Sequence, residues 1–284
     1  MMKKIVAIGL ILMWVTVSVA LAAEPVKIGV AAMVSPQETV KYYKQLIEYI
    51  GGKLGSPVEM VQKESYDEMD GMLERGEVQV AFVCAGPYVK DHAKFGAELL
   101  VAPQSYGQPF YRAYIIVNKN SPIKDLAGLK GKKFAFTDPK SNTGKIVPTY
   151  MVSKEFHMSP EKFFGEVLYT RSHDRSVEAV AKKMVDGASI DSLIYDYTVK
   201  TNPIYTSQTR IIRKSPAYGI PPIVVRKGMD PALKNKLKNI FLNMQNDPEG
   251  KAILAGIMVD KFIVPKDSDY NTVREMDTWL AKMK

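Results

Sequence analysis

Residues 134–144 read Phe-Ala-Phe-Thr-Asp-Pro-Lys-Ser-Asn-Thr-Gly, and the rest of the sequence can be interpreted outward from them. An apolar run ends at Asp138-Pro139, and three hydroxyl or amide residues then precede a glycine. A strand that passes into a helix start is a ready anion site, because first-turn N–H groups lack partners and carry partial positive charge. Ser141, Asn142 and Thr143 would add side-chain donors, and Gly144 would allow a ligand close to the backbone.

The same residues do not have the pattern of a nucleotide-binding loop. A P-loop needs a terminal Gly-Lys-Ser/Thr and a dinucleotide site needs three spaced glycines, and the stretch has neither pattern. The alternative to an anion site is an ordinary helix capped by one of these short polar residues, because such caps are common. The stretch alone leaves both interpretations open.

The first 23 residues predict a secretory signal peptide. Lys3 and Lys4 precede an apolar run over residues 5–20, and Ala20-Leu21-Ala22 supplies a small-x-small cleavage site. A membrane anchor is the alternative, but a span needs about 20 apolar residues and this run is shorter. We therefore expect cleavage, export and a periplasmic location.

Composition narrows the classes of partner. The 284 residues carry a formal charge of +9, with lysines spread along the chain and no basic clusters interleaved with aromatics, so no nucleic-acid partner is expected. A mildly positive field favours a small anionic ligand. One cysteine, Cys84, cannot form an internal disulfide, and we expect a buried small residue. His92, His157 and His173 lack paired metal-ligand spacing, so neither a metal nor another cofactor is predicted.

Hydrophobic periodicity predicts two successive strand–helix units. Strands are expected at residues 26–30, 58–61, 78–83, 111–118, 133–136, 167–170, 188–190 and 223–226. Helices are expected at residues 37–54, 66–76, 145–156, 175–185, 231–245, 248–255 and 270–284. This alternation predicts an α/β fold with two lobes, each a mostly parallel sheet flanked by helices, and a ligand cleft between them. The expected division is residues 24–120 and 218–284 in the first lobe and 121–217 in the second.

Polar residues follow several of these strands, where ligands bind in such sheets. Tyr66 follows a strand of the first lobe, while Ser141, His173 and Asp191 follow three strands of the second. A hydrolase triad of Ser141, His173 and Asp191 is an alternative, but Ser141 lacks the Gly-x-Ser-x-Gly elbow. Structural roles also stay open: a satisfied histidine for His173, a helix cap for Asp191 and packing aromatics for the tyrosines.

Several motifs together resemble the periplasmic phosphonate- and phosphite-binding proteins of ABC importers. They are Asp138-Pro-x-Ser-x-Thr-Gly-x-x-x-Pro148, Phe164-Gly-Glu-Val, Ser172-His-Asp, Pro222-Ile-Val-Val-Arg-Lys227, Ser35-Pro-Gln-Glu-Thr39, Gly86-Pro87 and Asp247-Pro-Glu-Gly250. The resemblance covers essentially the whole mature chain. It implies the type II periplasmic binding protein fold, which closes on its ligand by a hinge.

The resemblance also implies roles for individual residues. Ser141, Asn142 and Thr143 match the Ser-Thr-Ser that holds phosphonate oxygens, and His173 matches a histidine that donates to the oxyanion. Tyr66 and Tyr111 match pocket tyrosines of the other lobe, and Asp191 matches a variable polar position of the pocket.

Two positions depart from the relatives that bind aminoalkylphosphonates. Those relatives carry acidic residues where this chain has Leu193 and Pro221, and neither residue can pair an ammonium group. We therefore expect a compact oxyanion, such as phosphite, methylphosphonate or phosphate, to bind better than aminoethylphosphonate.

The sequence thus predicts the solute-binding component of an ABC transporter for a small phosphorus oxyanion. Its expected partners are that ligand and a membrane permease, and no catalysis is expected. A periplasmic sensor that signals to a membrane kinase is the main alternative, and a Ser/His hydrolase is a further one.

Overall fold

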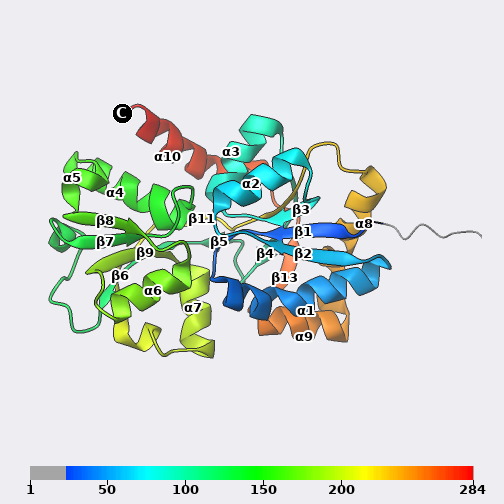
Figure 1. The fold of residues 1–284 in the computed structure, drawn as a ribbon, viewed down its shortest axis with the longest axis horizontal. Coiled ribbons are helices and arrows are strands. Elements are labelled where there is room, and N and C mark those ends of the chain that lie inside the picture. The colour runs from blue at the N-terminus through cyan, green and yellow to red at the C-terminus, as the bar shows by residue number, and fades with distance from the viewer. Residues whose placement is uncertain (1–23, 284) are drawn as a thin grey trace, which may run out of the picture.

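The computed structural model describes residues 24–283, and these residues form two α/β lobes joined side by side (Figure 1). The predicted signal peptide lies outside the described residues. Within residues 24–283, none of the helices is both long and apolar enough to cross a bilayer.

The first lobe is built on a six-stranded sheet in the order β13-β4-β12-β3-β1-β2. Its strands are β1 (Val26–Val30), β2 (Val58–Gln62), β3 (Val80–Phe82), β4 (Glu98–Gln104), β12 (Ile223–Val225) and β13 (Lys261–Ile263). The chain forms the helices α1 (Pro36–Leu54), α2 (Tyr66–Arg75), α3 (Ala85–Phe95), α8 (Pro231–Asn243) and α9 (Pro248–Gly256) in the same lobe.

The second lobe is built on a five-stranded sheet in the order β10-β6-β9-β7-β8. Its strands are β6 (Ala113–Asn118), β7 (Lys133–Phe136), β8 (Glu166–Tyr169), β9 (Gly187–Asp191) and β10 (Thr209–Lys214). Its helices are α4 (Val147–Phe156), α5 (Pro160–Phe163), α6 (His173–Ala181) and α7 (Ser192–Thr201). Short 3-10 turns, η1 (Ala127–Leu129) and η3 (Thr206–Gln208), complete it, while η4 (Met244–Asn246) and η5 (Asp267–Tyr270) belong to the C-terminal part.

A two-stranded antiparallel ribbon joins the lobes. It pairs β5 (Phe110–Tyr111) with β11 (Tyr218–Gly219). The chain leaves β5 at Arg112, whose backbone exchanges hydrogen bonds with Ser192 before β6 begins. Because the ribbon is short and the chain passes through it in both directions, it is the natural hinge between the lobes.

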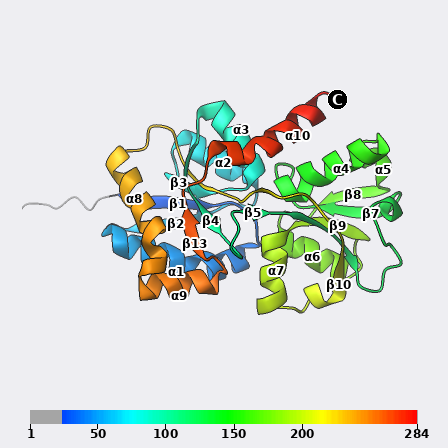
Figure 2. The same cartoon turned by 180° about the vertical axis from the view of Figure 1, so that it is seen from behind.

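The C-terminal helix α10 (Asn271–Ala281) lies across the junction (Figures 1 and 2). The Trp279 ring meets the Tyr150 ring of α4 edge-on, with centroids 5.1 Å apart. The chain therefore connects the lobes through packing as well as through the ribbon, and the expected placement of residues 218–284 wholly in the first lobe omits this contact.

Local sequence explains why α1 begins and ends where it does. Pro36 occupies the first turn, where its missing N–H costs nothing, and Gly55 ends the helix in the left-handed conformation at φ 67°. Leu46 and Ile50 lie one turn apart on the same face, and both are completely buried against the first sheet.

The two-lobed α/β fold is confirmed, with three corrections to the expected detail. The strand at residues 111–118 was expected in the first lobe, but β6 pairs with β9 and β10 of the second sheet. Both sheets are mixed, because β12, β13 and β6 run antiparallel to their neighbours. β4, β10 and β13 were not expected from the sequence. β4 contains Pro103, β10 contains two arginines and a lysine among its apolar residues, and β13 is very short, so none of them shows a clear strand pattern.

Candidate functional site

Helix N-termini from both lobes converge where the lobes meet. α2 and α3 follow β2 and β3 of the first sheet. α6, α7 and η2, a π-helical turn (Asn142–Ile146) that leads into α4, follow β8, β9 and β7 of the second. Each N-terminus carries the positive end of a helix dipole, although capping side chains such as Ser141 and Asp191 already pair some of the first-turn N–H groups. The resulting corner is electrostatically suited to an anion.

The stretch that the sequence singled out forms part of this corner. Ser141 caps η2, and its Oγ accepts a hydrogen bond from the Gly144 backbone N–H at 3.0 Å. The side chains of Ser141, Asn142 and Thr143 are completely buried. Gly144 also packs tightly against the strand end, because a Cβ there would lie 2.5 Å from the Thr137 side chain. Close approach of a ligand to its backbone stays a prediction.

His173 stands at the start of α6 with a fixed tautomer. Its Nδ1 accepts a hydrogen bond from the Asp191 backbone N–H at 3.1 Å, so the ring proton is on Nε2. The Thr137 hydroxyl also contacts Nδ1 at 3.1 Å. Burial lowers the pKa of His173 to about 3, so the ring is neutral at physiological pH. Its Nε2–H is therefore a neutral donor, and it has no partner among the described residues.

Two tyrosines face the same corner from the first lobe and the hinge. Tyr66 is the first residue of α2, and its hydroxyl lies near Ser141. Tyr111 belongs to the hinge ribbon rather than to a lobe, and it accepts a hydrogen bond from Asn142 Nδ2 at 3.0 Å. Burial raises the pKa of both tyrosines, so both keep their hydroxyl protons. The Asn142 amide could instead accept from Tyr111, which would free its NH₂ group for an oxyanion.

Asp191 is the N-cap of α7, as the structural alternative anticipated. Its Oδ1 accepts a hydrogen bond from the Leu193 backbone N–H at 2.7 Å. Burial raises the pKa of Asp191 to about 7, although the backbone donors of Leu193 and Ile194 oppose this shift. The carboxyl group therefore carries a proton for much of the time near neutral pH and can itself donate. A ligand contact by Asp191 stays a prediction.

The corner holds several buried polar atoms without a hydrogen-bond partner. Within the described part of the chain these include Tyr66 Oη, Asn142 Oδ1, Thr143 Oγ1 and His173 Nε2. Each unpaired buried group costs about 1–3 kcal/mol. Three of the four can donate a proton, so an oxyanion would satisfy them. The corner is thus closed around polar groups that need a ligand.

Several backbone contacts hold the lobes together around this corner. The His173 backbone N–H donates to the Met33 carbonyl at 3.1 Å, and the Ser35 N–H donates to Asp174 Oδ1 at 2.9 Å. Gly86 of α3 lies so near the second lobe that a Cβ would be 2.5 Å from the Lys140 carbonyl oxygen. The lobes therefore meet backbone to backbone, which only a residue without a side chain permits at Gly86.

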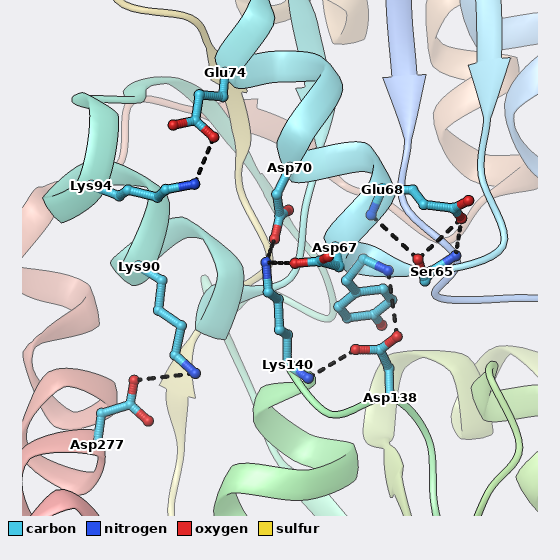
Figure 3. A network of polar contacts seen from close by, with 11 residues as sticks. Ser65, Asp67, Glu68, Asp70, Glu74, Lys90, Lys94, Asp138, Lys140 and Asp277 are labelled. Atoms are coloured by element: carbon cyan, nitrogen blue, oxygen red, sulfur yellow. Dashed lines mark hydrogen bonds and ion pairs between the residues drawn. The ribbon is translucent and has the colours of Figure 1, made fainter.

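Lys140 forms a second interlobe contact, shown in Figure 3. Its Nζ binds Asp67 Oδ1 at 2.6 Å and Asp70 Oδ2 at 2.8 Å, both on α2. Burial opposes the charge on Lys140, but the two carboxylates outweigh it and raise the Lys140 pKa. Asp70 is buried beside Asp91, and burial followed by the charge of Asp70 raises the Asp91 pKa. We call Lys140, Asp67 and Asp70 the lysine latch.

In each lobe, a residue of the latch is the sequence neighbour of a predicted site residue. Lys140 directly precedes Ser141, and Tyr66 directly precedes Asp67. Asp138 adds a further link, because its Oδ1 accepts from the Lys140 N–H at 2.8 Å and its Oδ2 from the Tyr66 N–H at 3.4 Å. Closing the latch therefore brings the Tyr66 hydroxyl to the anion loop.

Sequence reasoning missed the role of Thr137, the contact of Cys84 with Tyr111, and the latch. Thr137 supports His173 from the strand end itself. Cys84 follows β3, caps α3, and its thiol lies 3.6 Å from the Tyr111 hydroxyl, while burial raises its pKa. The expectation of a buried small residue at Cys84 is confirmed, but the sequence did not indicate that it would lie beside Tyr111. The sequence gives no sign that Lys140 would meet α2.

The three residues of the hydrolase alternative do not form a catalytic relay. His173 Nδ1 accepts from the backbone of Asp191 and not from its carboxyl group, and Nε2 has no partner among residues 24–283. Ser141 Oγ accepts from Gly144. In a Ser-His-Asp triad, the histidine accepts the serine proton at one nitrogen and donates to the carboxylate from the other. The geometry fits donors to a bound anion instead.

Comparison with known proteins identifies sequence relatives. The family described as "ABC transporter, phosphonate, periplasmic substrate-binding protein" matches residues 28–270. The phosphonates-binding periplasmic protein of Escherichia coli K12 is 32% identical over 174 residues, which cover 60% of this chain. The match spans only about half the length of that relative, namely 51%.

Solved structures match over nearly the whole chain. A binding-protein component of an ABC phosphonate transporter from Pseudomonas aeruginosa has a TM-score of 0.86 at 25% identity, covering 91% of this chain and 87% of its own. PhnD1 from Prochlorococcus marinus, solved in complex with methylphosphonate, has a TM-score of 0.81 at 19% identity, with coverages of 90% and 98%. At that identity the second likeness shows the fold alone.

Proposed function

Since the chain belongs to the family of periplasmic substrate-binding proteins of phosphonate ABC transporters, we propose that it captures a small phosphorus oxyanion for import. The oxyanion would be a phosphonate, phosphite or phosphate, held between the closed lobes. The observation that carries this proposal is the cluster of buried donors without partners at the interlobe corner.

In the proposed binding mode, the two lobes contribute different hydrogen-bond donors. The second lobe supplies Ser141, Thr143 and the neutral Nε2–H of His173 as donors. The first lobe brings the Tyr66 hydroxyl when the hinge closes. All four side-chain donors are uncharged, so the negative charge of the ligand is not neutralised. Hydrogen bonds from these donors to the charged oxygens are stronger than hydrogen bonds between two neutral groups. Such a site binds the anion without transforming it.

The family relationship supports two further parts of the proposal. The closed receptor would deliver its ligand to a membrane permease, as the family's description as an ABC transporter substrate-binding protein suggests. The predicted signal peptide would place the protein in the periplasm, where that delivery occurs. A reporter fusion of residues 1–30 that stays in the cytoplasm would contradict the export step.

Thermal unfolding with defined anions tests the proposal. Phosphite, methylphosphonate and phosphate are each compared with sulfate and acetate at equal ionic strength. A ligand that binds the native state raises its melting temperature by mass action, so at least one phosphorus anion is expected to raise it well above the sulfate control. Equal melting temperatures with all five anions would overturn the proposal.

A further inference from the structure

Two buried aspartates of the first lobe lie side by side at the lysine latch. Asp70 belongs to α2 and Asp91 to α3, and each exposes only 3% of its surface. Their side chains hydrogen-bond to each other. Among residues 24–283, no N–H or hydroxyl group donates to Asp70 Oδ1 or to Asp91 Oδ2. We call Asp70 and Asp91 the carboxyl pair.

The carboxyl pair holds a proton that belongs to both residues. A hydrogen bond between two carboxyl groups needs a proton, because an ionised carboxylate can only accept. Two neighbouring buried negative charges would also repel each other, so the first proton is bound tightly and is shared by the pair. Burial, followed by the charge of Asp70, raises the pKa of Asp91, in agreement with this argument. Near neutral pH the pair therefore carries one negative charge instead of two.

The cation that balances this charge comes from the other lobe. Lys140 precedes the anion loop of the second lobe, and its Nζ lies 2.8 Å from Asp70 Oδ2 (Figure 3). Both members of the carboxyl pair belong to the first lobe, so they stay together when the hinge moves. Opening the hinge would separate Lys140 from the pair and leave its negative charge without this partner.

The other charges around the carboxyl pair do not change lobes. Among the charges that act most strongly on the pair, Asp67 and Lys94 belong to the first lobe, and Lys140 alone belongs to the second. The remaining charged groups nearby have partners of their own: Lys94 with Glu74, Lys90 with Asp277 of α10, Arg75 with Glu77, and Glu68 with Ser65, while Lys63 lowers the pKa of Glu77. Lys140 is thus the charge whose distance from the pair depends on closure.

Resting on the proposed function, we propose that the carboxyl pair makes closure of the cleft release a proton, so that ligand binding weakens as the pH falls. With Lys140 in place, the negative charge of the pair is stabilised and a second proton is disfavoured. When the lobes separate, this stabilisation is lost and the pair binds a second proton more readily. By linkage, protons then favour the open form, and acid promotes release of the anion.

Calorimetry in two buffers that differ in their enthalpy of ionisation counts the protons exchanged on binding. Methylphosphonate is titrated into the purified protein at about pH 6, between the ordinary pKa of an aspartate and neutrality. Any proton exchanged by methylphosphonate itself or by Asp191 is common to the wild type and its variants, so the difference between them reports the carboxyl pair. The count is made per ligand bound, so it reports folded protein only.

Asp91→Asn is the decisive variant. The amide keeps the size of the side chain and donates a hydrogen bond to Asp70, so that no shared proton is needed. We expect the wild type to release about half a proton more than this variant, which corresponds to a loss of affinity about threefold steeper per pH unit. Lys140→Met removes the cation from the open and closed forms alike, and it should lose the same excess.

The matched control is Asp247→Asn. Asp247 pairs with Lys53 inside the first lobe and caps α9, a role that asparagine can also fill. Closure leaves this pair unchanged, so the variant should release as many protons as the wild type.

The outcomes separate this inference from the function on which it rests. If methylphosphonate binds and the wild type and Asp91→Asn release equal numbers of protons, the carboxyl pair is not linked to closure and the oxyanion receptor stands. If the wild type takes up protons relative to Asp91→Asn, exposure of the pair to water outweighs the loss of Lys140, and the inference is overturned. If methylphosphonate, phosphite and phosphate all fail to bind, the proposed function fails and the inference fails with it.

Discussion

The two lobes meet at one corner but contribute to it in different ways. The second lobe arranges polar groups in advance: Thr137 and the Asp191 backbone fix His173, and Ser141 is fixed by Gly144. The first lobe contributes the Tyr66 hydroxyl and, alongside it, the two carboxylates that receive Lys140. In the proposed function, the second lobe would therefore recognise the anion and the first lobe would hold the cleft shut.

The largest expected effect comes from preventing the lobes from meeting. Gly86→Ala would place a Cβ 2.5 Å from the Lys140 carbonyl oxygen, so the closed form must shift. Overpacking of this kind costs about 1–3 kcal/mol or more, and we expect calorimetric affinity for methylphosphonate to fall about 100-fold.

The matched control for that change is Gly52→Ala. A Cβ at Gly52, within α1, has no neighbour within 4 Å, so affinity should be unaffected and stability slightly raised by helix propensity. If Gly86→Ala binds as tightly as Gly52→Ala, then the lobes do not close as described.

The next largest expected effect is on oxyanion affinity, from the loss of single hydrogen-bond donors in the second lobe. Thr143→Val keeps the shape of the side chain but removes its buried hydroxyl, and we expect about tenfold weaker oxyanion binding, from about 1–3 kcal/mol per lost bond to a charged group. Ser141→Ala and His173→Ala should act similarly. Exposed Thr272→Val on α10 is the control. Unchanged calorimetric affinity in all three site variants would place the anion elsewhere.

A smaller effect on affinity is expected from the latch. Lys140→Met removes the cation that bridges to Asp67 and Asp70, and we expect methylphosphonate to dissociate about three- to fivefold faster, with little change in association. Lys94→Met removes a lysine–glutamate pair that stays within the first lobe, with Glu74, and serves as control. Stopped-flow release rates that are equal in the two variants would show that the latch does not hold the cleft.

The smallest expected effect is a pH dependence of the melting temperature, which arises from Asp191 in the second lobe. The raised pKa of Asp191, about 7 against an ordinary value near 4, means that the folded form holds its proton more tightly than the unfolded chain. The stabilisation is complete below about pH 4 and is lost as pH rises through about 7. The melting temperature of the wild type should therefore fall by a few degrees relative to Asp191→Asn between pH 4 and pH 8. A constant difference would mean that Asp191 is ionised throughout.

The sequence predicted those parts of the fold that depend on local pattern. The spacing of Leu46 and Ile50 indicated α1, and the strand ends before Ser141 and His173 indicated where polar groups would gather. The assignment of β6 failed because its buried side chains show that a strand is interior without showing which sheet it joins. The pairing that decides this question is made with β9 and β10, which lie far along the chain.

The site could be predicted in part for the same reason. Tyr66, Ser141 and His173 were recognisable from their places after strands and from the family resemblance. The latch was not, because Lys140 and Asp70 are separated by 70 positions and meet only when the lobes close. Gly86 was noted as part of a motif, yet its steric role depends on a carbonyl of the opposite lobe.

The helix α10 has a mechanical consequence for this receptor. A ribbon of two short strands resists neither bending nor twisting strongly, but α10 touches the second lobe through Trp279 and Tyr150, away from that ribbon. Any opening must therefore part these two rings or carry the end of α10 along with α4. The C-terminal helix is thus a second connection between the lobes. It limits the angle and the axis of the rotation by which the lobes can separate while this aromatic contact is kept.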